Sequence, residues 1–250
     1  MRVVITRPRE QAESFAQALR ARGFEPVHFP TIRIAALENP APIDAALERL
    51  HLCDWAIFTS TNAVEAVWAR LAHTGLPFPD GVRVAAIGPK TARRLQAHGI
   101  RPDFVPHRFL SEAILPGLGD LAGKRVFLPL GDLAADALPA AIETAGGIPL
   151  TITAYRTLPA QPDPAGLAAL RSGVDAVTFT SGSTARNFVT LLRRAGLDPF
   201  HLPGNPAIAC IGPKTAAAAR AAGLRVHAVA KEHTVEGLLA ALEQTKPHHT

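Results

Sequence analysis

The sequence predicts an α/β protein made of two similar doubly wound domains, each with a parallel sheet covered by helices on both faces. Two observations carry this prediction. The chain repeats itself once along its length, and within each copy short apolar runs alternate with segments of helical periodicity. A third observation, proline and glycine at opposite ends of the helical segments, predicts where the helices begin and end.

The internal duplication rests on four blocks that recur in the same order and at a nearly constant spacing. Residues 2–5 match 125–128, residues 54–60 match 175–181, residues 84–92 match 208–216, and residues 111–115 match 234–238 more weakly. Matches that keep both order and spacing indicate a duplicated unit, so each copy occupies about half of the chain. We therefore expect two similar domains.

The strands are predicted from continuous apolar runs such as residues 82–87 and 207–211. Runs without polar alternation suit a parallel sheet that is buried on both faces. The segments that follow Ser60 and Ser181 instead carry apolar residues at helical spacing, which predicts helices packed on the sheet. The apolar stripes are Val64, Val67, Trp68 and Leu71 in one segment and Ala185, Phe188, Val189 and Leu192 in the other.

Two further helices are predicted after the repeated sequence Ile-Gly-Pro-Lys-Thr-Ala. Pro89 and Pro213 stand near the first helical position, where a missing N–H costs nothing, and Gly99 and Gly223 stand where the helices stop. This arrangement gives each copy the order strand, loop, helix, repeated. Such an order is typical of a doubly wound sheet.

Composition limits the kind of protein. The chain has 250 residues, of which 48% are hydrophobic and 19% charged, with a net charge of +5. No apolar run approaches the roughly 20 residues that span a bilayer, and the first ten residues lack a signal-peptide core, so we expect a soluble, cytoplasmic protein. Basic residues are scattered, which argues against a surface that binds nucleic acid. The net positive charge favours an acidic small molecule as the ligand. Cys53 and Cys210 are expected to be buried, reduced thiols.

Ligands of open parallel sheets bind beyond the carboxyl ends of the strands. Six such turns are predicted, at residues 6–8, 59–62, 88–91, 129–132, 180–183 and 212–215. Hydroxyls, glycines and a few cations dominate them, and a helix N-terminus beside a hydroxyl can bind an anion. Each hydroxyl taken alone is better explained as a helix cap. The whole set facing one cleft favours a ligand with several negative charges.

The usual catalytic and cofactor signatures are absent from the sequence. Residues 117–123 miss the dinucleotide pattern by one residue, and Arg125 stands where a P-loop requires Ser or Thr. His248 and His249, at the chain's end, are the one close histidine pair. We therefore expect no cofactor, no nucleotide and no metal. Tyr155 is the single tyrosine, and on composition alone it is more often a packing residue than a catalytic one.

The assembled pattern resembles the uroporphyrinogen-III synthase family across nearly the whole chain. Each matching piece is short, but their order and spacing together are specific. The pieces are residues 5–8, the two Phe-Thr-Ser strand ends, the two Ile-Gly-Pro-Lys-Thr-Ala turns, residues 154–157 and residues 234–239.

The resemblance implies an interleaved architecture that the repeat does not reveal. Residues 1–35 and 160–250 would form one discontinuous domain, and residues 36–159 the other. Two extended linkers, near residues 31–42 and 153–164, would join them and leave a cleft between them. Two consecutive domains that divide near Gly123 remain a physical alternative.

The resemblance also implies a reaction. Members of this family are lyases of tetrapyrrole (haem) biosynthesis that dehydrate and cyclise hydroxymethylbilane to uroporphyrinogen III, inverting ring D through azafulvene and spiro intermediates. This linear substrate bears eight carboxylates and cyclises unaided to the wrong isomer, so the enzyme mainly has to hold one fold of it. No cofactor is implied. Hydroxymethylbilane synthase is the expected donor of the substrate, and a monomer is expected.

Site residues follow from the same resemblance, position by position. Tyr155 matches a cleft tyrosine that assists departure of the hydroxyl. The expected substrate-binding residues lie in the predicted turns and are Thr6, Arg7, Ser60, Thr61, Thr91, Ser181, Gly182 and Thr215. One position departs from the family, since Leu130 stands where an arginine is common, and a ligand contact from that loop is therefore in doubt.

Two other functions remain open at this stage. A catalytically silent member of the same fold, acting as a ligand-binding or regulatory module, is favoured by Leu130 and opposed by Tyr155 and the intact turns. A two-domain solute-binding protein would also place a cleft between α/β lobes. Proteins of that class are normally exported, whereas no signal sequence is evident here.

Overall fold

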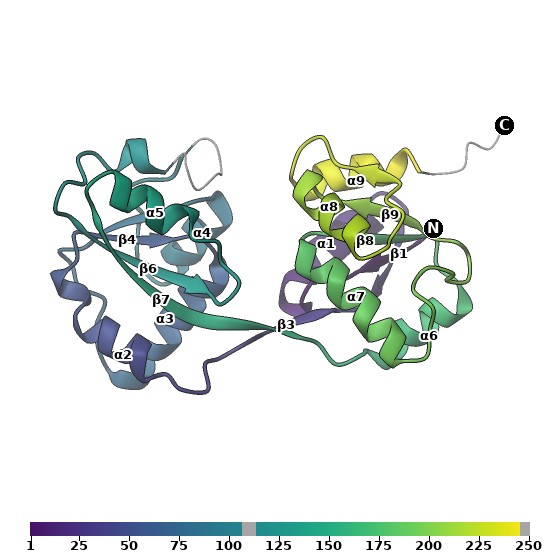
Figure 1. Cartoon of the computed structure of the whole chain (residues 1–250), viewed down its shortest axis with the longest axis horizontal. Helices are drawn as coiled ribbons and strands as arrows, with labels where there is room; N and C mark the ends of the chain where they lie inside the picture. Colours follow the sequence, from purple (N-terminus) through teal and green to yellow (C-terminus); the bar gives the residue numbers. More distant parts are fainter. Residues whose placement is uncertain (107–113, 246–250) are drawn as a thin grey trace. The chain divides into compact units, whose positions relative to one another are not determined.

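The computed structural model describes residues 1–106 and 114–245, and the chain divides into two compact units (Figure 1). Unit 1 comprises Met1–Arg33 together with Leu158–Thr250, and unit 2 comprises Ile34–Thr157. Part of the weak repeat match at residues 111–115, and the pair His248 and His249, lie outside the described residues. Each unit contains one five-stranded sheet.

Unit 1 has the strand order β10-β9-β8-β1-β2, and the recorded pairs are parallel. Its strands are β1 (Arg2–Ile5), β2 (Glu25–His28), β8 (Ala176–Phe179), β9 (Ala207–Cys210) and β10 (Ala228–Val229). Its helices are α1 (Arg9–Arg20), α6 (Pro164–Ser172), α7 (Gly182–Arg194), α8 (Pro213–Ala221) and α9 (Val235–Glu243). The central strand β8 is buried along its whole length, as expected for a strand covered on both faces.

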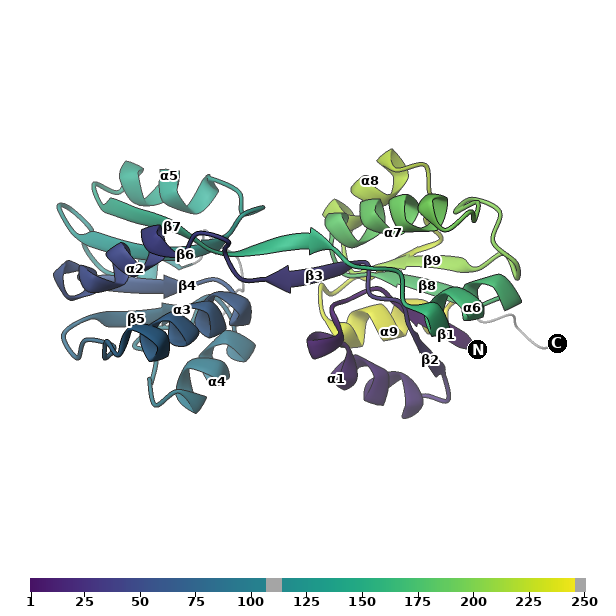
Figure 2. The same cartoon turned by 90° about the horizontal axis from the view of Figure 1, so that it is seen from below.

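The two faces of this sheet have separate cores. Phe188 of α7 and Ala216 of α8 pack with Val4 and Val177 on one face. The other core contains side chains from α1 and α9, and Figure 2 shows these helices across the sheet from α7 and α8. The doubly wound parallel class is thereby confirmed for this unit.

Unit 2 has the strand order β3-β7-β6-β4-β5. Its strands are β3 (Ile32–Ala35), β4 (Trp55–Phe58), β5 (Arg83–Ala86), β6 (Arg125–Gly131) and β7 (Ile148–Pro159). Its helices are α2 (Ala41–Glu48), α3 (Thr61–Thr74), α4 (Pro89–Ala97) and α5 (Ala137–Thr144), with short 3-10 turns η1 (Leu50–Leu52) and η3 (Leu115–Gly117). Side chains of α2, α3 and α4 share one core and those of α5 another, so this sheet is also covered on both faces.

Several predictions from local pattern are confirmed. The apolar runs 82–87 and 207–211 contain β5 and β9, and the helices after Ser60 and Ser181 bury their apolar stripes, with Trp68 only partly buried. Gly99 and Gly223 follow α4 and α8 at φ angles of 84° and 90°. In this left-handed region glycine ends a helix without steric strain.

The connection between the repeat copies differs from the simple alternative. β1 pairs with β8, so strands from both halves of the duplication lie in one sheet, and a division near Gly123 is wrong. The chain passes between the units through β3 and β7. The extended segment expected from residue 153 begins inside the sheet of unit 2, because Thr153 and Tyr155 pair with β6.

One predicted turn is also wrong. Residues 129–132 were expected to follow a strand, but β6 continues to Gly131. Proline is tolerated there because β4 pairs with β6 only at Val126 and Phe127. Beyond Phe127 the recorded partner of β6 is β7 alone. The side of Pro129 that lacks an N–H can therefore face β4, where no ladder hydrogen bond is needed.

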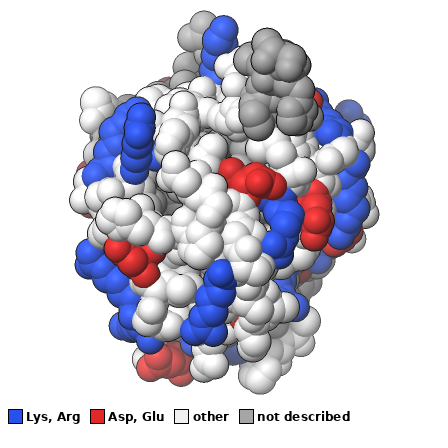
Figure 3. Space-filling model, turned by 90° about the vertical axis from the view of Figure 1, so that its right-hand side faces the viewer, with Lys and Arg blue, Asp and Glu red and all other residues white. Residues whose placement is uncertain are grey.

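Both cysteines are buried and unpaired, as predicted, and burial raises the pKa of the Cys210 thiol to about 11. Among the described residues, no helix has the length and apolar character that crossing a membrane requires. The face in Figure 3 carries Lys and Arg dispersed among Asp, Glu and uncharged residues rather than gathered into one patch.

Candidate active site

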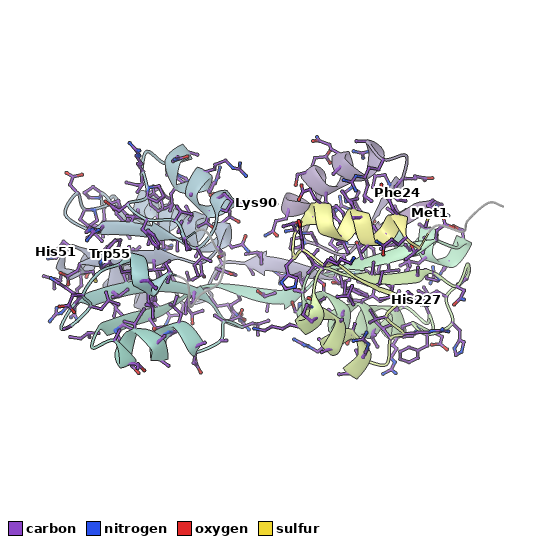
Figure 4. The ribbon with its side chains drawn as sticks, turned by 90° about the horizontal axis from the view of Figure 1, so that it is seen from above. Met1, Phe24, His51, Trp55, Lys90 and His227 are labelled. Atoms are coloured by element: carbon purple, nitrogen blue, oxygen red, sulfur yellow. The ribbon has the colours of Figure 1, made fainter. Side chains whose placement is uncertain are left out.

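The polar turns of each unit lie at the carboxyl ends of its parallel strands, the edge where sheets of this class bind ligands. In unit 2, Lys90 near the start of α4 lies at the opposite end of the sheet from Trp55, the first residue of β4 (Figure 4). Corresponding turns of unit 1 follow β1, β8 and β9.

Ser60 and Tyr155 form the most specific contact at the edge of unit 2. Ser60 adopts extended backbone angles at the N-cap of α3, and its Oγ accepts a hydrogen bond from Ala63 N at 3.1 Å. The same Oγ lies 3.2 Å from the hydroxyl oxygen of Tyr155, which comes from β7, 95 residues along the chain. Ser60 Oγ therefore contacts both the first turn of α3 and the Tyr155 hydroxyl.

Tyr155 is half-buried and packs against the core formed by α2, α3 and α4. Its ring is therefore held by apolar contacts while its hydroxyl reaches the polar turn after β4. This is the usual placement of a tyrosine whose ring is apolar and whose oxygen is solvated or bonded. A phenol in such a place can exchange a proton with a bound molecule.

Thr91 and Thr215 occupy the same place in the two units, the third residue of α4 and of α8. They are 5% and 6% exposed, and neither hydroxyl makes a side-chain hydrogen bond within the described residues. No fully buried side-chain oxygen among the described residues lacks a hydrogen-bond partner, so these two hydroxyls reach the surface and are open to a ligand. Each of these lies at a helix N-terminus beside N–H groups that have no acceptor inside the helix, so an anionic group could bond to both.

Ser181 begins α7 as the N-cap of a capping box. Its Oγ accepts from Thr184 N at 3.3 Å and lies 2.9 Å from Ser183 Oγ. Gly182, the next residue, lets α7 and α8 approach, since a Cβ there would lie 2.8 Å from Ala218 Cβ. Ser181 and Gly182 thus have structural roles that are compatible with a ligand at this helix end.

Thr6 and Arg7 follow β1. Thr6 is fully buried and its Oγ1 donates to Thr178 O at 2.7 Å, so this side chain supports the turn and has no free donor for a ligand. Arg7 is half-buried, donates to Gln11 Oε1 at 3.3 Å, and has no carboxylate partner within the described residues. Burial lowers the pKa of its guanidinium, which an incoming carboxylate would offset.

Thr61 is the first residue of α3 and is half-buried. Leu130 lies in β6 and is buried in the core beneath α5. The structure therefore places Ser60, Thr61, Thr91 and Tyr155 in unit 2, and the remaining predicted residues in unit 1.

Two residues that were not predicted also lie at the polar edge of unit 1. Arg186 is exposed on α7, has no acidic partner within the described residues, and extends its Nη1 to 3.2 Å from where a Cβ on Gly182 would lie. The His233 ring covers Gly212, the N-cap of α8, at 2.9 Å from the corresponding position. The spacing of Arg186 four residues after Gly182 is a signal that could have identified it. His233 lies in a loop without periodicity.

The sequence was compared with protein families and with individual known proteins. The sequence model of the family described as uroporphyrinogen-III synthase HemD matches residues 13–240. The chain belongs to this family. A uroporphyrinogen-III synthase of Synechococcus elongatus is 34% identical over 97% of this chain and 94% of its own length. One of Chlorobaculum parvum is 28% identical over 90% of each.

Solved structures of the uroporphyrinogen-III synthase family share the fold. A mutant of the Thermus thermophilus protein superposes with a TM-score of 0.63 at 23% identity, covering 98% of both chains. The Helicobacter pylori protein, described as uroporphyrinogen-III synthetase, also gives 0.63, at 21% identity, covering 98% of this chain and all of its own. These likenesses establish the two-domain α/β fold of the family for this chain.

Proposed function

We propose that this chain is a lyase of tetrapyrrole (haem) biosynthesis that dehydrates and cyclises hydroxymethylbilane to uroporphyrinogen III, inverting ring D. The observation that carries the proposal is the Tyr155 phenol, held 3.2 Å from Ser60 Oγ at the carboxyl edge of a sheet in a chain of this family. A half-buried phenol with a hydroxyl partner is suited to assist the departure of a hydroxyl group.

In the proposed reaction the Tyr155 phenol gives its proton to the leaving hydroxyl as the carbon–oxygen bond breaks. Water departs, and the pyrrole nitrogen supplies the electron pair that forms the azafulvene cation. Ring D then attacks through its substituted carbon, and the spiro intermediate fragments and recloses in the inverted orientation. The last pyrrole loses a proton as it regains aromaticity, and that proton restores the phenol, so the net loss is one water.

Binding would use the helix N-termini. The substrate carries eight carboxylates, and Thr91, Thr215 and the Ser181 turn each offer hydroxyls at the start of a helix, where backbone N–H groups can bind an anion. Arg7 and Arg186 add positive charge without an acidic partner among the described residues. Many modest contacts can select one fold of a flexible chain, and this positioning is the main catalytic effect that the reaction requires.

The chain would act without a cofactor, in the cytoplasm, as a monomer, and would receive its substrate from hydroxymethylbilane synthase. One observation favours a second function, a catalytically silent member of the fold that binds a ligand. At Leu130, where the family resemblance implies an arginine, the side chain is buried in the core and offers no charge to a ligand.

The deciding experiment supplies hydroxymethylbilane to the purified chain, with metals chelated and no nucleotide added, and resolves the type I and type III isomers. We expect predominantly type III product, formed faster than in a control without protein. Product that is entirely type I, at the rate of that control, would favour the silent member of the fold.

A further inference from the structure

The Tyr155 ring lies directly on the backbone of Gly131. A Cβ built on Gly131 would lie 2.7 Å from Tyr155 Cζ, 2.8 Å from Cε2 and 2.8 Å from the hydroxyl oxygen. These are the atoms at the reactive end of the phenol. Carbon atoms that are not bonded to one another pack about 3.5–4.0 Å apart, so any side chain at this position has to push that end of the ring away.

The backbone conformation does not explain this glycine. Its φ lies outside the left-handed region, unlike the turn glycines of the same unit such as Gly123 and Gly146. Alanine could therefore adopt the same backbone angles. What Gly131 supplies is room for the phenol, which is the other common reason for a glycine in a strand.

The local strand geometry points Tyr155 into that space. Leu130 pairs with Thr153, but Gly131 pairs with Tyr155, so the register between β6 and β7 shifts by one residue at this point. Such irregularities redirect a side chain relative to its regular alternation. Asp132 N donates to Tyr155 O at 3.1 Å, and Thr157 N donates to Asp132 Oδ1 at 2.8 Å. The backbone from Tyr155 to Thr157 is thus held by Asp132.

Ser60 constrains the hydroxyl itself. A serine oxygen accepts two hydrogen bonds and donates one. Here it accepts from Ala63 N, the free N–H of a helix start, which polarises the serine O–H and makes it a better donor. If the serine O–H donates to the Tyr155 oxygen 3.2 Å away, the phenolic O–H is free to donate to a bound molecule.

We propose that Gly131 and Ser60 are positioning residues for Tyr155. Gly131 leaves the space that the phenol occupies, and Ser60 donates to the phenolic oxygen, so that the Tyr155 proton faces the leaving hydroxyl and the developing phenolate is stabilised. This inference rests on the proposed function, in which Tyr155 supplies that proton. Since both residues act through Tyr155, neither substitution should cost more activity than the loss of the phenol itself.

The test compares Gly131→Ala with Gly147→Ala. Gly147 is a matched control, since its φ is also outside the left-handed region and an added Cβ would lie 2.7 Å from Ile142 Cγ2, away from Tyr155. Because Tyr155 is the single tyrosine, 13C labelling at the ring carbon that bears the hydroxyl gives one NMR signal. We expect Gly131→Ala to move that signal and to lower kcat by about tenfold with little change in KM. Gly147→Ala should leave the signal, kcat and KM close to those of the original chain.

A double variant separates positioning from general damage. In a Tyr155→Phe background, Gly131→Ala should reduce kcat by less than twofold, since no phenolic proton remains to be positioned. Multiplicative losses would overturn the proposal, as would an unmoved NMR signal in Gly131→Ala.

If Gly131→Ala does not fold, Ser60 provides the second variant. Ser60→Ala should move the same signal and lower kcat, and Ser60→Thr, which keeps the hydroxyl, should restore both. Failure of Ser60→Thr to restore them, or no change in Ser60→Ala, would overturn the role of Ser60. The NMR signal reports the placement of Tyr155 even if the unaltered chain forms no type III product, so failure of the proposed function is recognised separately.

Discussion

Replacing Tyr155 with phenylalanine removes one oxygen atom and little else. The hydrogen bond that is lost is neutral, 3.2 Å long and half-buried, so the free energy of unfolding should fall by only about 0.5 kcal/mol, the low end for one hydrogen bond. The effect on the reaction should be larger. A positioned acid contributes about 10²–10⁴-fold, but this substrate ionises readily, so we expect about a tenfold to hundredfold loss in kcat, or roughly 1.4–2.7 kcal/mol of barrier.

The assay follows initial rates over a range of hydroxymethylbilane concentrations and resolves the product isomers. KM should change less than kcat, because the phenol acts mainly in the transition state. Thermal melts of both chains accompany the kinetics, since a half-buried tyrosine also contributes to packing. Full activity in Tyr155→Phe would refute the assignment of the proton donor, and a rise in KM at unchanged kcat would show that the phenol only binds substrate.

The remaining predictions address binding, stability and folding. Thr215→Ala should raise KM by an amount that corresponds to roughly 0.5–1.5 kcal/mol, with the isomer ratio nearly unchanged, because it removes one of many carboxylate contacts. Thr31→Val should lower the free energy of unfolding by about 1 kcal/mol in urea titrations at an unchanged m-value, since the one proton of the buried Thr31 hydroxyl is donated to Thr184 O at 3.0 Å or Thr6 O at 3.2 Å. Hydrogen bonds from Arg70 lower the pKa of Asp44, so its contribution to stability is present above the unfolded pKa and is lost as pH falls through the folded pKa. The gap in melting temperature between the original chain and Asp44→Asn should therefore shrink in acid. Residues 34–157 expressed alone should unfold cooperatively, and loss of secondary structure in that fragment would show that unit 2 depends on unit 1.

The local elements could be predicted from sequence because their causes are local. The helix after Ser181 follows from a hydroxyl cap and an apolar stripe on neighbouring turns, and α4 and α8 follow from Pro89 and Pro213 at their starts. The duplication then predicts that both halves repeat one architecture, so two parallel sheets follow without knowing which strands are neighbours.

Pairings between distant segments could not be predicted in the same way. Nothing in the residues of β1 states that β8 rather than β4 lies beside it, since both are buried apolar runs. The interleaving came from family resemblance instead. The expected turn at residues 129–132 failed for a related reason, since the length of β6 depends on its pairing with the distant strand β7, and that pairing extends to Gly131.

The sequence could predict which residues belong to the candidate site but not which of them contact one another. The turn hydroxyls can be found because they begin helices, but the contact of Tyr155 with Ser60 and Gly131 depends on the register of β6 against β7. Thr6 illustrates the opposite case, since its place in a polar turn suggested binding whereas its hydroxyl is used inside the fold. Arg186 could have been found from its spacing to Gly182, whereas the place of His233 over Gly212 is evident only in the structure.

The pairing of β1 with β8 has a consequence for synthesis of the protein. Arg2 N donates to Asp175 Oδ2 at 2.6 Å, across 173 residues of chain. At about 5–20 residues per second, a ribosome needs on the order of ten to thirty seconds between the two strands. Unit 2 is continuous in sequence and can fold within that interval. During this time β1, α1 and β2 lack β8, so the backbone groups on one edge of β1 have no strand to pair with. Nascent chains that stall soon after unit 2 would expose this edge, and they are the species that chaperones or proteases should find first.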